Sequence, residues 1–253
     1  MKRIIFSIFI LVLVITLHSY ELEQLILAPT AGLLRRGESE INAKLYKDNG
    51  LLVGTKVGLF PRFMFGINYG AERIVGNQDP IWHERVEFNA KYRLFDESPQ
   101  MPAFVIGFNS QGHGKYYPEQ SRYDIKSKGF YGVASKNWSF LGNLGLHLGV
   151  NYSLENKKDD NIGIFAGADK NIGEVITFLG EYDLGINDNE NWLENETSEN
   201  LDILGHGYLN LALKVNFTEY LFLKISMFDL LKNRSDTQGC DRALTLVYLM
   251  TFQ

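Results

Sequence analysis

Apolar and polar residues alternate with a period of two along most of this chain. The clearest example is the stretch 208–217, in which the apolar positions are Leu209, Leu211, Leu213, Val215 and Phe217. The stretches 143–152 and 82–94 follow the same rule. Successive side chains of a strand point to opposite faces, so the pattern predicts strands with one apolar and one polar face.

About twelve such strands are predicted, and most span about 9 to 12 residues, which suits a tilted strand crossing a bilayer better than an ordinary globular strand. They begin near Gly37, Leu51, Arg62, Trp82, Pro102, Phe130, Asn143, Asn161, Glu174, Gly205, Tyr220 and Arg242. The chain also has 13% aromatic residues and 24 glycines, which favours strands and turns over helices.

The predicted connections alternate between short and long. Short ones fall at 60–61, 140–141, 171–173 and 218–219, and long ones at 71–81, 110–129, 186–204 and 230–241. This rhythm is typical of the periplasmic turns and extracellular loops of outer-membrane barrels. Unpaired backbone groups are costly in hydrocarbon, so the sheet must close. We therefore expect an all-β fold, a transmembrane antiparallel up-and-down β-barrel with both ends on the periplasmic side.

The two ends of the sequence point to export. Residues 1–20 combine Lys2 and Arg3 with an apolar run at 4–17, as in a secretory signal peptide, which leaves 21–253 for the barrel. The last stretch, 244–253, resembles the aromatic-terminated final strand that the barrel-insertion machinery reads. We expect a location in the bacterial outer membrane, with that machinery, membrane lipids and lipopolysaccharide as partners.

Charge and cysteine content exclude several classes. The net charge of −5 argues against a nucleic-acid binder, and the single cysteine, Cys240, cannot form an intramolecular disulfide. The acidic stretch 187–202 lacks the spacing of a calcium loop, and no Cys/His cluster has zinc-site spacing. We expect no cofactor and no metal.

Three parts of the chain resemble the YjbH-type family of outer-membrane barrels: 29–32, 50–59 with 65–69, and 102–108 leading to 130–136. The resemblance implies a β-barrel without catalytic residues, associated with the production or export of surface exopolysaccharide. It thus adds exopolysaccharide as a possible partner.

The polar faces supply candidates for lining the lumen: Glu38, Glu40, Lys44, Arg85, Glu87, Lys91, Arg93, Glu181 and Lys214. Two interpretations stay open. The charges could tune the selectivity of a small porin-like channel for ions or small solutes. They could equally pair across a lumen with little free space.

The long stretch 110–129 mixes basic and aromatic residues, which suits stacking on sugars or meeting an anionic polysaccharide. Its candidate contact residues are Lys115, Tyr116, Tyr117, Arg122 and Tyr123. An ordinary long loop is the alternative.

A third functional class is an outer-membrane lipid hydrolase, which needs a histidine beside a serine on the lipid-facing wall. No histidine of the sequence stands two residues from a serine on a predicted lipid-facing side, and His83 and His147 are predicted to point inward. We therefore expect no enzyme.

Overall fold

The computed structural model describes residues 21–77, 79–155, 159–188, 203–234 and 240–252. The predicted signal peptide lies outside them. Among the described residues, no helix is both long and apolar enough to cross a membrane.

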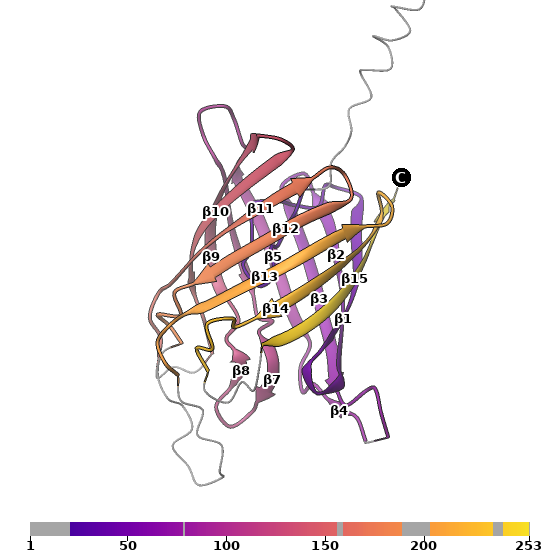
Figure 1. Cartoon of the computed structure of the whole chain (residues 1–253), viewed down its shortest axis with the longest axis vertical. Coiled ribbons are helices and arrows are strands. Elements are labelled where there is room, and N and C mark those ends of the chain that lie inside the picture. Colours follow the sequence, from indigo (N-terminus) through magenta and orange to yellow (C-terminus); the bar gives the residue numbers. More distant parts are fainter. Residues whose placement is uncertain (1–20, 78, 156–158, 189–202, 235–239, 253) are drawn as a thin grey trace, which may run out of the picture.

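Twelve strands of the described chain form a closed barrel (Figure 1). They are β1 (Glu38–Tyr46), β2 (Gly50–Phe60), β3 (Phe63–Glu72), β5 (Glu87–Phe95), β6 (Ala103–Asn109), β9 (Gly129–Ser139), β10 (Asn143–Tyr152), β11 (Gly163–Ile172), β12 (Ile176–Asp183), β13 (Tyr208–Asn216), β14 (Leu221–Phe228) and β15 (Asp241–Thr251).

The barrel closes where the first strand meets the last. β1 pairs antiparallel with β15, from Glu38 opposite Thr251 to Leu45 opposite Leu244. Every other wall strand pairs with its neighbours in the chain, except that β3 pairs directly with β5 and β6 directly with β9. The sheet has no open edge, which is the condition for a β-structure to span a membrane.

Three short elements lie outside the wall. β4 (Ile81–Trp82) extends the end of β3, and β7 (His113–Tyr117) pairs with β8 (Arg122–Ile125) in a separate hairpin. A single 3-10 turn, η1 (Lys47–Asn49), joins β1 to β2. In Figure 1 the hairpin lies at the end of the barrel opposite the C-terminus.

The two faces of the wall differ as predicted. The outward face exposes large apolar side chains, among them Ile41, Val53, Ile67, Phe88, Ile106, Leu148, Phe178, Leu211, Leu246 and Tyr248. The inward face buries polar ones, among them Glu40, Lys56, Asn68, Asn89, Lys91, Glu181, Asn210 and Lys214. Apolar side chains thus face outward and polar ones inward, which is the reverse of a soluble protein. Together with the strand pairing, this confirms the predicted antiparallel barrel of twelve strands.

The predicted strand starting near Trp82 is wrong in detail. The wall strand β5 begins only at Glu87, and Ile81–Trp82 forms the separate β4. The reason is local: the Trp82 ring stacks on Tyr69 at 6.0 Å, and the His83 N–H donates to the Gly70 carbonyl at 2.9 Å. These contacts hold the chain beside β3 before it turns into β5.

The lumen holds an apolar cluster that strand alternation did not predict. Its wall side chains are Ala103, Val105, Tyr131, Val133, Phe165, Leu179, Ala212, Phe228 and Ala243. They pack against Leu25, Ile26, Ala28 and Ala31, which precede β1 in the chain. Part of the inner wall is therefore built like the core of a soluble protein, against a segment that lies inside the barrel.

Arginine substitutions measure which face meets lipid. We expect Leu211→Arg, near the middle of the outward face of β13, to lower the free energy of unfolding by about 2 to 4 kcal/mol. Phe217→Arg, just beyond the end of the same strand and 58% exposed, should cost only about 0 to 1 kcal/mol. Folding titrations in lipid vesicles measure both. Equal costs at the two positions would contradict the placement of the membrane.

Strand alternation alone would suggest Asn210, the inward neighbour of Leu211, as a tolerant control. The structure excludes it. Asn210 is 1% exposed, its side-chain amide donates to Glu181 at 2.8 Å, and its side-chain oxygen accepts from the Asp229 N–H at 2.9 Å. A larger charged side chain has no space there.

Candidate functional site

Residues 21–36, named here the lumenal segment, precede β1, and most of them lie inside the barrel, whereas Arg35 and Arg36 at its end are exposed. The segment folds back on itself, because the Thr30 N–H donates to the Glu23 carbonyl at 3.2 Å and the Leu25 N–H donates to the Ala28 carbonyl at 3.0 Å. Leu25 is 0% exposed. The segment therefore forms a compact loop that offers backbone donors and acceptors to the surrounding wall.

Glu181 of β12 holds one side of this loop. Its carboxylate accepts three consecutive backbone N–H groups, from Ile26 at 3.0 Å, Leu27 at 2.9 Å and Ala28 at 2.8 Å. The side chain of Asn210 donates a fourth hydrogen bond at 2.8 Å. Hydrogen bonds to an ionised carboxylate are about twice as strong as neutral ones, so this contact is a strong anchor.

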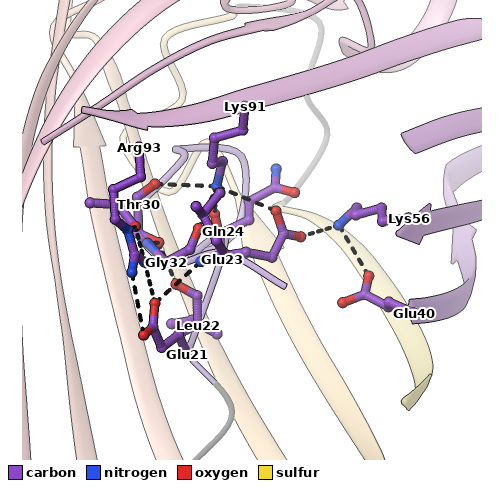
Figure 2. A network of polar contacts seen from close by, with 12 residues as sticks. Glu21, Leu22, Glu23, Gln24, Thr30, Gly32, Glu40, Lys56, Lys91 and Arg93 are labelled. Atoms are coloured by element: carbon purple, nitrogen blue, oxygen red, sulfur yellow. Dashed lines mark hydrogen bonds and ion pairs between the residues drawn. The ribbon is translucent and has the colours of Figure 1, made fainter. Parts of the chain in front are cut away.

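Lys91 of β5 holds the loop on another wall (Figure 2). Its ammonium group donates to the carbonyl oxygens of Glu23, Thr30 and Gly32, at 2.5, 3.2 and 3.1 Å. Two residues along the strand, Arg93 donates to the Ala31 carbonyl at 3.1 Å. The buried positive charges are thus surrounded by backbone oxygens.

Glu23 of the lumenal segment lies between two lysines of the wall, Lys56 and Lys91. Its carboxylate pairs with Lys56 of β2 and lies 3.5 Å from the ammonium group of Lys91. Lys56 also pairs with Glu40 of β1 at 3.0 Å, as Figure 2 shows. Burying a charge is costly unless it is paired, and here the lumenal segment supplies partners for the wall.

Polar side chains on the neighbouring strands β9, β10 and β11 form a continuous chain of hydrogen bonds, named here the polar ladder. Ser135 Oγ lies 2.7 Å from His147 Nδ1, and His147 Nε2 lies 2.9 Å from Asp169 Oδ1. Ser135 Oγ also accepts the Ala31 N–H at 2.8 Å. These residue types also occur in hydrolytic triads, but here the serine oxygen is occupied by the Ala31 backbone. The ladder holds the lumenal segment against the wall.

A polar chamber of about 90 Å³ remains in the lumen. It is lined by part of the lumenal segment, including Gln24 and Leu27, and by Gln111 and Gly112, which precede the hairpin. The wall around it carries Glu40, Asn42, Lys44, Leu52, Lys56, Asn68, Asn89, Asn109, Lys214, Phe222, Lys224, Ser226, Phe228, Thr245 and Val247. A polar space of this size accommodates several water molecules.

The β7–β8 hairpin lies at the end of the barrel opposite the C-terminus, with part of its side chains buried (Figure 1). Tyr123 donates from its hydroxyl to Glu87 and from its backbone N–H to Glu155, each at 2.8 Å. Arg122 pairs with Asp188 at 2.7 Å. Glu155 belongs to the connection between β10 and β11, and burial raises the pKa of its carboxyl group. The hairpin is therefore bonded to both the wall and the neighbouring connections.

The predicted lumen-lining residues fall into two groups. Glu40, Glu87, Lys91, Glu181 and Lys214 are buried in the lumen, and Lys44 and Arg93 are partly buried there. Glu38 instead accepts the Arg35 N–H at 2.7 Å near the start of β1, and Arg85 precedes β5 with a half-exposed side chain. The last two therefore flank the lumen and do not line it.

The outer-loop candidates also divide. Lys115 is exposed, and its ammonium group lies 5.3 Å from the ring centre of Tyr117. Tyr116 and Tyr117 are partly buried. Arg122 and Tyr123 are each 1% exposed, because the hairpin turns them into the protein. A surface ligand cannot reach these two side chains, which corrects their assignment as polysaccharide contacts.

The sequence-based prediction missed the lumenal segment, which it had assigned to the barrel without a separate role. One signal was available. Between the predicted signal peptide and the first predicted strand lie about sixteen residues that include Leu22, Leu25, Ile26, Leu27 and Ala28. This apolar content exceeds what a solvated leader to a strand needs.

Among the described residues, no group of three or more His, Cys, Asp or Glu side chains is placed to hold a metal ion. No family model matches the chain, and no curated protein matches it.

The chain is similar in structure to outer-membrane porins. A structure described as KdgM porin aligns with a TM-score of 0.50 and 10% identity, covering 85% of this chain and 99% of that chain. The NanC porin aligns with a TM-score of 0.44 and 9% identity, covering 85% and 99%. At these identities the likeness shows the fold alone, which is that of an outer-membrane β-barrel of twelve strands.

The hairpin should respond to pH through His113, which lies outside the spanning strands. Burial, followed by the ammonium group of Lys44 at 2.9 Å from Nδ1, lowers the pKa of His113 to about 4. Nε2 lies 2.8 Å from Asp241. The docked hairpin thus keeps a neutral imidazole, whereas an undocked one takes up a proton below its ordinary pKa of 6.5.

Docking should therefore be fully stable above about pH 6.5 and weaken between about pH 6.5 and 4, by up to about 1.4 kcal/mol per pH unit. Hydrogen exchange of the hairpin amides, corrected for intrinsic rates, measures this in the wild type and in His113→Gln. The difference between the two proteins removes contributions common to both, such as that of Glu155. A difference that does not change with pH would contradict the assignment.

Proposed function

We propose that this protein is an outer-membrane channel of the porin type for ions and small polar solutes, and that the structure represents its closed state. The observation that carries the proposal is the polar chamber enclosed by the wall. Its lining of lysine, glutamate and asparagine side chains suits hydrated solutes, and charged side chains of both signs set the selectivity of such pores. The similarity of the fold to a porin supports the same function.

Two elements inside the wall border the chamber. The lumenal segment lines it with residues that include Gln24 and Leu27, and Gln111 and Gly112, which lead into the β7–β8 hairpin, line it as well. Conduction therefore requires that at least one of these elements moves. Because neither element belongs to the twelve-stranded wall, such movement leaves the barrel closed to lipid.

A role in surface exopolysaccharide production or export is the second candidate, and the filled lumen favours it. A barrel that never opens would act through its outer surface, where Lys115 and Tyr117 place a cation beside an aromatic ring. Aromatic rings and cationic groups suit contact with an acidic sugar chain. This proposal extends the resemblance to the YjbH-type family.

Outer-membrane lipids, lipopolysaccharide and the barrel-insertion machinery are the partners proposed under either function. The support is the exposed apolar belt of the wall and the last strand, whose outward residues include Leu246 and Tyr248.

Single-channel recording of the refolded protein in a planar bilayer tests the channel. We expect conductance with brief openings, and we expect Lys214→Glu, in the chamber wall, to shift the zero-current potential toward cation selectivity. Lys47→Glu, exposed in the turn between β1 and β2, is the matched control and should change it little. Inserted protein that stays silent under all voltages, or a shift equal in both variants, would contradict the channel.

A further inference from the structure

We propose that the lumenal segment is a releasable plug, held by two latches on different walls of the barrel, and that its release opens the passage. The proposal rests on the proposed channel function. The first latch is Glu181 of β12, which binds the backbone N–H groups of residues 26–28. The second is Lys91 of β5, which binds the carbonyl oxygens of Glu23, Thr30 and Gly32.

The latches act from well-separated strands. Around the wall, β5 and β12 are separated by β6, β9, β10 and β11 on one side and by six strands on the other. A loop bound to both must extend across the lumen. The two latches are also complementary in charge. The Glu181 carboxylate accepts from backbone N–H groups of the loop, and the Lys91 ammonium group donates to its carbonyl oxygens.

The wall does not depend on the segment for its own pairing. All twelve strands are paired with each other, and β1 meets β15 along its whole length. The pairing of the segment with the wall strands is confined to one isolated bridge, between Arg36 and Gly58, among the described residues. Next to this bridge, the Glu38 N–H of β1 donates to the Arg35 carbonyl at 2.9 Å. The other contacts described here between the segment and the wall are side-chain contacts and apolar packing. The segment can therefore leave without opening the sheet.

Other features of the chain favour reversible release of the lumenal segment. Gly37, with φ of +85°, links the segment to β1 in a backbone conformation that other residues rarely adopt. Its N–H donates to the Gly58 carbonyl at 3.0 Å, so the segment stays attached to the wall at this point when the preceding residues leave. Inside the segment, the Glu23–Thr30 and Leu25–Ala28 hydrogen bonds do not involve the wall, so the loop can keep its shape when released. The latch side chains would then be hydrated in an open polar lumen, which offsets part of the lost contacts.

Thiol labelling measures release without relying on conductance. Cys240 is first replaced by Ser, and Ala28→Cys is added as the reporter, because Ala28 is 2% exposed between the segment and the wall. The refolded full chain in lipid vesicles is treated with a charged, water-soluble maleimide. In this background we expect slow labelling.

The latch variants should accelerate it. Glu181→Gln removes the charge and one acceptor, and we expect labelling roughly 10- to 150-fold faster, the change in equilibrium that follows loss of a hydrogen bond to a charged group. Lys91→Met removes the second latch and should act in the same direction. Glu174→Gln, the same chemical change in the turn between β11 and β12, should leave the rate unchanged.

Circular dichroism and resistance to denaturation in the same samples establish that each variant is a folded barrel. Two latch variants are used so that the failure of one to fold leaves the other. Unchanged labelling in a folded latch variant overturns the plug. Labelling that accelerates equally in Glu174→Gln overturns the assignment of the latches.

Conductance of the same variants separates this inference from the proposed function. Faster labelling together with longer openings supports both. Faster labelling in a barrel that stays silent supports the plug and overturns the channel. Wild-type conductance that no latch variant changes, with unchanged labelling, keeps the channel and overturns the plug.

Discussion

A backbone polar group inside a bilayer has no water to bond with, and each one left unpaired costs several kcal/mol. The fold of this chain follows from that constraint. Twelve strands satisfy their ladders only because β1 meets β15, two elements at opposite ends of the described sequence. Once the ring is closed, every wall strand has one face toward lipid and one toward the lumen, and the alternation of apolar and polar residues follows the same division.

Closure creates a second requirement, because the lumen collects charged side chains that are shielded from bulk water. Lys56, Lys91 and Glu181 are each at most 7% exposed. The lumenal segment supplies main-chain partners to Lys91 and Glu181 and the Glu23 carboxylate to Lys56. Because a peptide backbone has both donors and acceptors, one short loop can hydrogen-bond to an anionic side chain on one wall and to a cationic side chain on another.

The sequence predicted the wall well because period-two alternation reports directly on the two solvents of a strand. It predicted inward positions for Glu40, Lys91 and Lys214 for that reason, and all three side chains are buried. It failed where the local pattern carries no such information. The sequence around Arg122 and Tyr123 is like that of an exposed loop. The hairpin nevertheless turns both side chains inward, where they contact Asp188 and Glu87, which are distant in the sequence. The lumenal segment was missed because its partners lie far along the chain.

Those distances in sequence have a consequence for the order of assembly. The contact between Ile26 and Glu181 joins residues 155 positions apart, and that between Lys224 and Leu25 spans 199. The β1–β15 seam closes a loop of similar length. Contacts of this kind carry the largest loss of chain entropy, so they form after the local hairpins of the wall. Filling of the lumen and sealing of the barrel are thus expected to be late events of folding, and the inward charges of the wall lack these partners until residues from the beginning of the chain reach them.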